Sequence, residues 1–333
     1  MLYYKIMKNN NKSRLLSGVK PTGRPHIANY FGSMKQFVDL QSDYQALIMV
    51  ADLHALTTVW DADTLRRDIW DLALDYLAIG LDPEKVVIFR QSDVAEHTEL
   101  TWVFNCITSV PYLMRSHAYK DASAKNQEVS VGTFDYPMLM AADILLYDPQ
   151  VVPVGQDQKQ HVEYARDTAE KFNRLFGETF TLPEGLILSG VQTVTGLDGR
   201  KMSKSYNNHI PLFSEPDQVV ALVKKIVTDS KDPSEPKDPE TCNIFALLKL
   251  FAGEGELSEL RQRYRDGNIG YKESKEILAE KIIAYFEPMR KKRKEIAARP
   301  ELVHQILSEG AKATKELAAA KMETVRKRVG LEF

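Results

Sequence analysis

Short apolar runs alternate with amphipathic stretches along the first third of the chain. Residues 13–17 predict a short strand, and apolar runs of the length of a buried strand cover residues 46–51 and 86–89. Apolar residues recur at helical spacing over 27–40 and over 63–80, where Asp63 can cap the helix. Because strands that alternate with amphipathic helices form parallel sheets covered on both faces, this pattern predicts an α/β fold with a Rossmann-like, doubly wound parallel sheet.

The following elements continue the alternation, with one interruption. Residues 111–133 are irregular and mostly polar, and they predict an insertion at about 110–135. Pro137 is expected in the first turn of the next helix, where its missing N–H has no cost. The expected elements of this part are helices over 96–109, 136–147 and 156–172, and a strand over 151–155.

The last third of the chain has a different character. After a helix over 216–228, three prolines among charged residues indicate a loop at 229–240. From residue 243 onward the pattern is helical, without a convincing strand. The sequence therefore predicts two domains, a Rossmann-like domain over 1–205 and an α-helical domain over 206–333.

Composition and charge exclude several classes of protein. The formal net charge of −2 argues against a protein that coats nucleic acid through bulk charge, although a local basic face remains compatible with it. Cys106 and Cys242 are the only cysteines, so we expect neither a disulfide framework nor a cysteine metal cluster, and no metal ligands are assigned. The chain shows no signal-peptide apolar core and no long apolar run, which indicates a cytoplasmic location without membrane contact.

The densest group of candidate functional residues is the run KMSKS at 201–205. Lys201 and Lys204 stand three residues apart in a segment that follows the turn Gly196–Arg200, and two serines lie beside them. Two mobile ammonium groups can close over the β- and γ-phosphates of ATP and neutralise charge as pyrophosphate leaves. The alternative is a solvated charged turn, the usual meaning of two lysines at this spacing.

A second candidate lies at the start of the helix expected over 27–40. His26 and Asn29 share the first turn, where unpaired backbone N–H groups form a ready anion site. The small Ala28 between them would let an adenine ring approach the backbone. The chain contains neither a dinucleotide-binding glycine pattern nor a P-loop, so a nucleotide must be bound by another arrangement.

A third candidate is Asp143, a carboxylate within the almost wholly apolar helix expected over 136–147. A buried charge needs a strong hydrogen-bond donor, which could be a neighbouring element or a substrate N–H group. Tyr136, Met140 and Asp143 share one helix face, so they could line an apolar pocket with a single acceptor.

Together, HIAN at 26–29 and KMSKS at 201–205, 175 residues apart from His26 to Lys201, resemble the HIGH and KMSKS elements of class I aminoacyl-tRNA synthetases. The segments YPMLMAADILLY and VPVGQDQKQH, which begin at 136 and 152, are similar to those of the bacterial tryptophanyl-tRNA synthetases within that class. Ala28 stands where the family usually has glycine, and Lys20 stands where many bacterial members have glutamine.

The resemblance implies a role for each matched position. The residues implied to act in catalysis are Lys201, Lys204, His26 and Asn29. Those implied to bind ATP are Lys20, Pro21, Thr22, Ala28, Asn29, Gly155, Gln156, Asp157, Val194, Lys201, Met202, Ser203, Lys204 and Ser205, with Lys120 or Lys125 as the mobile-loop lysine. Those implied to bind tryptophan are Asp143, Met140, Tyr136, His54, Gln158 and Gly18.

The implied reaction joins L-tryptophan to tRNA(Trp), with ATP as a substrate and Mg²⁺ on its phosphates. The helical domain over 206–333 is expected to bind the tRNA anticodon, with the basic residues at 290–294 and along 312–328 as candidates that could equally be a solvated helix face. The apolar residues at 110–114 suggest a homodimer. The alternatives are a tyrosyl-tRNA synthetase, disfavoured by Met140, a small-molecule adenylyltransferase, and a non-catalytic tRNA-binding paralogue.

Overall fold

The computed structural model describes residues 12–116, 119–120, 123, 128–153, 159–186 and 193–332. The chain divides into two compact units, each assembled from segments that are distant in sequence: unit 1 comprises 1–23, 36–189 and 296–333, and unit 2 comprises 24–35 and 190–295. The domain boundary expected between residues 205 and 206 falls inside unit 2, and the last segment of the chain belongs to unit 1.

Unit 1 is built on a five-stranded sheet in which neighbouring strands are parallel, in the order β3-β2-β1-β4-β5. The strands are β1 (Arg14–Val19), β2 (Gln45–Val50), β3 (Val86–Arg90), β4 (Val151–Pro153) and β5 (Glu184–Leu186). The chain moves outward from β1 to β3 and then returns to the other side of β1, which makes the sheet doubly wound, as the sequence predicts. The strand β5 was not predicted, because its three residues are largely exposed and form no apolar run.

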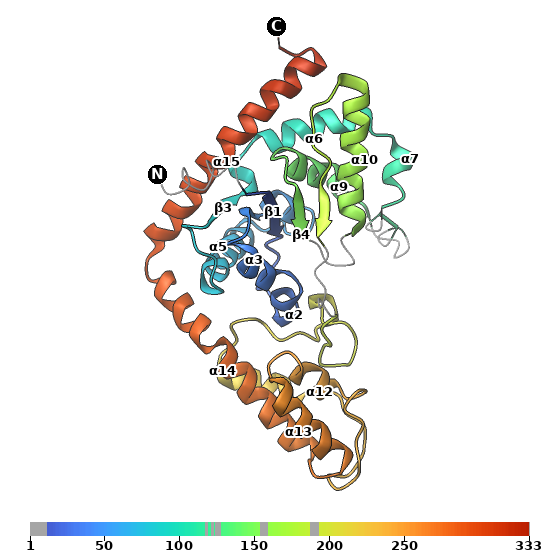
Figure 1. Ribbon diagram of the computed structural model, residues 1–333, viewed down its shortest axis with the longest axis vertical. Coiled ribbons are helices and arrows are strands. Elements are labelled where there is room, and N and C mark those ends of the chain that lie inside the picture. Colours follow the sequence, from blue (N-terminus) through green and yellow to red (C-terminus); the bar gives the residue numbers. More distant parts are fainter. Residues whose placement is uncertain are drawn as a thin grey trace. The chain divides into compact units, whose positions relative to one another are not determined.

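Helices surround this sheet, and three of them, α6, α9 and α10, pack against one another (Figure 1). The helices of unit 1 are α3 (Lys35–Leu40), which begins at the last residue of a unit 2 segment, α4 (Asp52–Ala55), α5 (Ala62–Ala78), the 3₁₀ turn η2 (Gln91–Asp93), α6 (Glu96–Ile107), α7 (Val110–Leu113), α9 (Val131–Leu145), α10 (Lys159–Phe176) and α15 (Pro300–Val329). None of the described helices combines the length and the apolar content that a membrane span requires.

Two predicted details of these helices are wrong. The N-cap of α5 is Asp61, whose carboxylate accepts from the Thr64 N–H at 2.8 Å, and Asp63 lies in the first turn. Pro137 lies inside α9 and not in its first turn, because the side chain of Ser130 accepts from the Thr133 N–H and starts the helix earlier.

The long C-terminal helix α15 packs on β3, an edge strand of the sheet (Figure 1). The approach is closest at Gly310, where an added Cβ would lie 1.9 Å from the carbonyl oxygen of Ile88. Further along the helix, Arg326 donates to both carboxylate oxygens of Glu99 at 2.7 and 2.5 Å, and Lys321 donates to the Thr179 carbonyl at 2.8 Å. Part of the basic track expected along 312–328 is therefore engaged in intramolecular pairs.

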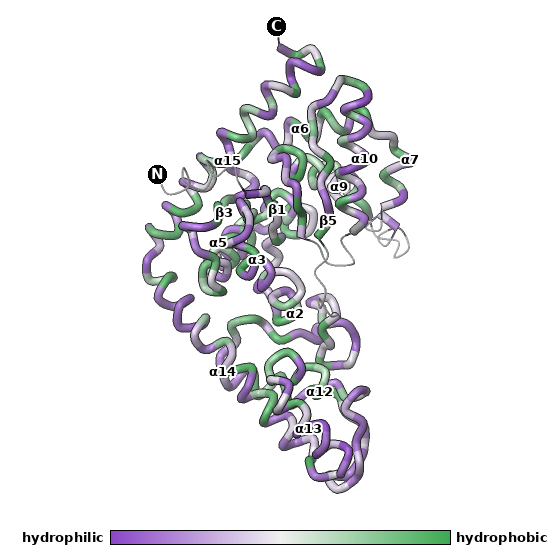
Figure 2. The backbone as a smooth tube through the Cα atoms, viewed as in Figure 1, coloured by the Kyte–Doolittle hydropathy of each residue, from purple (hydrophilic) through white to green (hydrophobic). Residues whose placement is uncertain are grey.

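Unit 2 contains the helical segment that follows the first sheet strand and most of the helical third of the chain. Its elements are α2 (Ile27–Asn29), the π-helix η1 (Tyr30–Met34), the 3₁₀ turn η4 (Lys204–Tyr206), α11 (Pro216–Lys224), α12 (Asn243–Leu248), α13 (Glu254–Arg265) and α14 (Tyr271–Ala297), whose last two residues belong to unit 1. Hydrophobic and hydrophilic segments alternate along α14 (Figure 2), which buries Leu278, Ile282 and Phe286. From residue 243 to residue 332 the structure describes helices and no strand, as the sequence pattern predicts.

Candidate active site

Asp143 on α9 forms the centre of a buried hydrogen-bonded network in unit 1. Its side chain is almost fully buried, so its charge depends on the groups around it. One carboxylate oxygen lies 2.7 Å from His97 Nδ1, and the other lies 2.9 Å from His54 Nε2. The Gln91 amide donates to both oxygens, at 2.7 and 2.9 Å.

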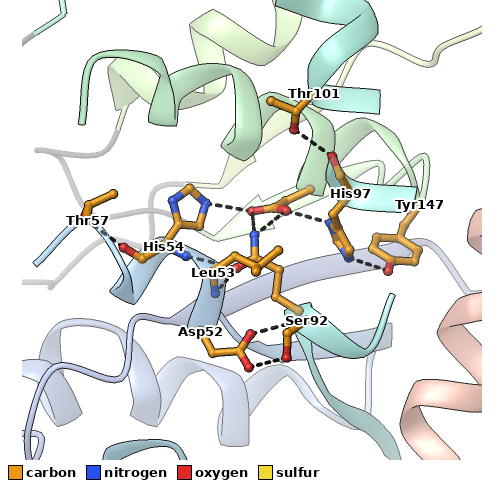
Figure 3. Close-up of polar contacts among 10 residues, drawn as sticks. Asp52, Leu53, His54, Thr57, Ser92, His97, Thr101 and Tyr147 are labelled. Carbon is orange, nitrogen blue, oxygen red and sulfur yellow. Dashed lines mark hydrogen bonds and ion pairs between the residues drawn. The ribbon is translucent and has the colours of Figure 1, made fainter. Parts of the chain in front are cut away.

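The histidine behind Asp143 is contacted on its other side by Tyr147. The hydroxyl of Tyr147 lies 2.9 Å from His97 Nε2 (Figure 3). If the hydroxyl donates this hydrogen bond, the ring proton of His97 is on Nδ1, where it faces Asp143. The Gln91 side chain is also oriented, because its carbonyl oxygen accepts from the N–H groups of Leu53 and His54 at 3.1 and 3.3 Å.

These contacts keep Asp143 ionised. Burial alone would raise the pKa of Asp143, but the interactions with His97 and His54 outweigh it and hold that pKa well below its ordinary value. The contacts from His97, Gln91 and His54 engage both oxygens of the carboxylate. Among these donors His54 is the most accessible, with a side chain that is 12% exposed.

The structure brings together three of the residues expected to bind tryptophan, namely Asp143, His54 and Tyr136. The ring of Tyr136 stands edge-on to His54 with centroids 6.1 Å apart, and burial raises the pKa of Tyr136 to about 12. Met140, one helical turn before Asp143 on α9, is half-buried. Gly18 lies in β1, where an added Cβ would be 2.6 Å from the Met49 carbonyl oxygen, so close packing of β1 on β2 explains the glycine.

The two motifs expected to bind the nucleotide lie in unit 2. His26 caps α2: its Nδ1 accepts from the Asn29 N–H at 3.3 Å, while the Asn29 side-chain oxygen accepts from the His26 N–H at 3.0 Å. The ring proton of neutral His26 is therefore on Nε2, as a donor. Burial, with smaller contributions from Lys204 and His209, lowers the pKa of His26 to about 4, so the ring is neutral at pH 7.

The backbone connects these distant motifs directly. The Ile27 N–H donates to the Ile210 carbonyl at 3.0 Å, and the Leu212 N–H donates to the Pro25 carbonyl at 2.9 Å. His26 thereby pairs with Pro211 as an isolated antiparallel bridge. The segment that follows KMSKS is therefore anchored beside HIAN, in agreement with the expectation that the two motifs act together.

Residues 194–208, which we call the lysine loop, form a short hairpin followed by a 3₁₀ turn. The Met202 N–H donates to the Val194 carbonyl at 2.9 Å, and the Gly196 N–H donates to the Arg200 carbonyl at 2.7 Å. The side chain of Ser203 then caps η4 by accepting from the Ser205 N–H at 3.2 Å. Val194 and Met202 are buried, so they anchor the hairpin.

The other residues expected to bind ATP are only partly described. Lys20 donates to the Thr57 hydroxyl at 2.7 Å, and burial lowers the pKa of Lys20. The loop of Pro21 and Thr22 is fixed at Gly23, whose N–H donates to the buried Asp68 at 2.6 Å. Ala28 lies within α2, and Lys120 is exposed. Gly155, Gln156, Asp157, Gln158 and Lys125 lie outside the described residues.

Several functional candidates were not predicted from the sequence, namely Gln91, His97, Asp68 and Asn208. Gln91 opens a polar turn directly after β3, and polar residues at the carboxyl end of a parallel strand are a recognisable signal. His97, Asp68 and Asn208 lie on helices or in a loop without a comparable local signal.

Comparison with known proteins gives consistent results. Residues 7–287 match the family of tRNA synthetases class I (W and Y). The chain is 48% identical to the tryptophan–tRNA ligase of Rhodopirellula baltica over 318 residues, covering 96% of this chain and 99% of the relative. It is also 48% identical to the tryptophan–tRNA ligase of Fusobacterium nucleatum over 319 residues, covering 96% of this chain and 98% of the relative.

Similarity to solved structures extends along the same length. The tryptophanyl-tRNA synthetase of Campylobacter jejuni, complexed with ADP and tryptophan, matches with a TM-score of 0.89 and 44% identity, covering 95% of this chain and 99% of that chain. The tryptophanyl-tRNA synthetase of Mycoplasma pneumoniae matches with a TM-score of 0.82 and 29% identity, covering 96% of this chain and 98% of that chain. The chain therefore belongs to the family of tRNA synthetases class I (W and Y).

Proposed function

We propose that the chain is a tryptophan–tRNA ligase that activates L-tryptophan with ATP and transfers it to the 3′ end of tRNA(Trp). The observation that carries this proposal is its 48% identity with curated tryptophan–tRNA ligases over nearly its full length. The presence of both HIAN and KMSKS in one compact unit supports a catalytically competent protein over a non-catalytic paralogue.

Tryptophan selection is assigned to the network around Asp143. An ionised, buried carboxylate strongly favours a ligand that offers an N–H group, and rejects analogues that would leave the acceptor unpaired. The half-buried Met140 on the same helix suits a flat apolar ring better than a phenol hydroxyl. This pairing favours tryptophan over tyrosine, the substrate of the nearest alternative enzyme. His54 and Tyr136 complete the assigned lining, with Gly18 and Gln158 as further candidates.

The activation step is assigned to His26, Asn29, Lys201 and Lys204. A carboxylate oxygen of tryptophan attacks the α-phosphorus of ATP, the bond between that phosphorus and the α,β-bridging oxygen breaks, and pyrophosphate leaves with the extra negative charge. The amino-acid carboxylate is already ionised, so no general base is required. The neutral His26 ring donates through Nε2, and the two lysines neutralise the departing charge. Mg²⁺ is assigned to the phosphates of ATP.

Exposed apolar and basic side chains support a proposal for assembly and for tRNA binding. Trp102, Val110 and Met114, on or next to α6 and α7, are 70%, 60% and 44% exposed, which is an unusual cost for a monomer. We assign this patch to a homodimer, with one tRNA spanning both subunits. The exposed basic residues Lys291 and Lys292 of α14 are candidates for contacts with the tRNA backbone.

ATP–pyrophosphate exchange, measured separately with each of the twenty standard amino acids, tests the proposed function. Tryptophan alone is expected to support efficient exchange, because Asp143 accepts a hydrogen bond from the ring N–H and the apolar Met140 weakens binding of a phenol hydroxyl. Faster exchange with tyrosine than with tryptophan would reverse the substrate assignment. Absence of exchange with every amino acid, from protein that binds tryptophan, would favour the non-catalytic alternative.

A further inference from the structure

The side chain of Asn208 lies at the centre of the lysine loop, although it belongs to neither recognised motif. It is 2% exposed. Its Nδ2 donates to Asp198 Oδ1 at 2.6 Å and to the Lys201 carbonyl at 3.1 Å, and its Oδ1 accepts from the Ser203 N–H at 2.8 Å. Its own carbonyl accepts from the Leu197 N–H at 2.9 Å. One residue therefore connects the turn at the start of the loop with the backbone of its KMSKS run.

The loop is built closely around this side chain. At Gly196 an added Cβ would lie 2.3 Å from Asn208 Nδ2 and 2.8 Å from the Asn208 carbonyl oxygen, so only glycine fits. Hydrogen bonds from Asn208 and Arg200 lower the pKa of Asp198 to about 2, which keeps its carboxylate ionised at neutral pH. The bond from Asn208 to Asp198 is therefore charge-assisted and among the stronger hydrogen bonds of the loop.

We propose that Asn208 and Asp198 form a clasp that positions Lys201 and Lys204 for the activation step. Asn208 fixes the carbonyl of Lys201 and the N–H of Ser203, the residue directly before Lys204. This proposal rests on the phosphate-binding role proposed above for the two lysines. Asn208 is thus a positioning residue, which acts through the lysines and does not itself touch the substrate.

The physical reason is the flexibility of lysine. An ammonium group on a four-carbon stem can adopt many positions, so its placement depends on the backbone from which the stem begins. Charge stabilisation in a transition state requires placement within a fraction of an ångström. A loosened backbone would weaken contacts that tighten as pyrophosphate leaves, and would therefore reduce kcat more than it raises the KM for ATP.

A charge-swap experiment tests the clasp. In Asn208→Asp, two carboxylates face each other and the Lys201 carbonyl loses its donor, so kcat for tryptophan-dependent pyrophosphate exchange is expected to fall about 10- to 100-fold. The KM for tryptophan should stay within about twofold of wild type, because the tryptophan network lies in unit 1. In the double variant Asp198→Asn/Asn208→Asp the amide and the carboxylate exchange places, so part of the lost kcat is expected to return, while the Lys201 carbonyl stays without its donor.

Two control variants isolate the effect. Asn207→Gly changes the exposed neighbour, whose φ of 50° suits glycine, and should keep wild-type kcat. Arg200→Gln removes the other side-chain partner of Asp198 and shows how much of the loss that remains in the double variant comes from that pair. The stoichiometry of tryptophan binding, measured by calorimetry, gives the fraction of folded chains in each variant. If Asn208→Asp does not fold, Asn208→Ala replaces it, with the same expected loss in kcat.

Failure of this inference is distinguishable from failure of the proposed function. Lys204→Ala is measured in the same assay. If Lys204→Ala lowers kcat while Asn208→Asp leaves it unchanged, or if the swap recovers nothing, the clasp is wrong and the role of the lysines stands. If Lys204→Ala has no effect on kcat, the proposed role of the loop itself is wrong, and the clasp with it.

Discussion

Asp143 shows how the environment of one residue determines its chemistry. A carboxylate in a nearly apolar helix would ordinarily be protonated by burial, yet His97, Gln91 and His54 keep it ionised. With three donors in place, a substrate N–H group needs one of them to withdraw. His54 is the donor that can do so, since Gln91 and His97 are completely buried.

We therefore expect His54→Leu to strengthen tryptophan binding by roughly tenfold, the scale of one hydrogen bond to a charged acceptor. The variant leaves an oxygen of Asp143 without its donor until an indole N–H reaches it. Calorimetric titration with tryptophan provides the measurement. In the matched titration with 1-methyltryptophan, which lacks the ring N–H, the gain should disappear. Equal gains for both ligands, or none for tryptophan, would contradict the exchange.

His26 makes a prediction about pH and stability. Its pKa is about 4 in the folded chain, against 6.5 for an ordinary histidine, so the unfolded state binds the proton first as the pH falls. The contribution of His26 to stability is therefore complete above about pH 6.5 and declines as the pH falls towards 4. The depressed pKa of Asp143 acts separately, in a more acidic range.

The expected loss from His26 is about 2 kcal/mol in the free energy of unfolding between pH 7 and pH 5. His26→Asn keeps an acceptor for the cap of α2 and removes the titrating group. Urea titrations of both proteins at the two pH values should show a smaller pH dependence for the variant. The pKa of His209 is also lowered, by burial and Lys204, so some dependence should remain. Identical pH dependence would show that His26 titrates normally.

At the scale of elements, the contact between α15 and β3 depends on the absence of one side chain. Gly310→Ala would place a methyl group against the Ile88 carbonyl, so the helix would have to move away from the strand. We expect a loss of about 1–3 kcal/mol or more in the free energy of unfolding, the usual cost of overpacking. Gly255→Ala is the matched control, since nothing lies within 4 Å of its added Cβ in α13, and alanine should be neutral or stabilising there. Thermal unfolding compares the two variants, and an equal effect would argue against the close contact.

The elements that the sequence predicts well are those with a strong local period. The apolar run of β2 and the helical spacing of α5 appear almost where the pattern places them. The failures have non-local causes. Ser130 starts α9 earlier than the apolar stretch of that helix suggests. The strand β5 pairs through its backbone and has no apolar run. The periodicity of α15 predicts a long helix, but it does not predict that this helix packs on the sheet.

In the candidate site, too, the local motifs can be predicted from the sequence and the non-local contacts cannot. His26, Asn29, Lys201 and Lys204 belong to short motifs, and the structure places these motifs beside each other through the Ile27–Ile210 hydrogen bond. Their supporting residues are contributed by other elements. His97 reaches Asp143 from α6, and Asn208 returns to Asp198 after a left-handed residue at 207, relations that only the folded chain establishes.

At the scale of the whole molecule, function is distributed over two units that the sequence order does not separate. The residues proposed for tryptophan belong to unit 1, and those proposed for the phosphates of ATP belong mainly to unit 2. The segment 24–35, which contains HIAN, belongs to the same unit as the lysine loop, whereas the segments before and after it in the sequence belong to unit 1. A linear division of the chain after residue 205 would therefore cut through the lysine loop and separate Asn208 from Asp198 and Lys201.

The proposed homodimer gives the last prediction. Wild-type protein at low micromolar concentration is expected to sediment at twice the chain mass of 37.8 kDa, because Trp102, Val110 and Met114 would otherwise expose a large apolar surface. Val110→Glu should weaken the dimer by at least tenfold in dissociation constant, since it buries a charge in an apolar interface. Val227→Glu is the matched control: Val227 is 55% exposed against 60% for Val110, but it belongs to unit 2, so the dimer should persist. A monomeric mass for the wild type, or equal weakening by both substitutions, would show that the patch on α6 and α7 is not the contact between subunits.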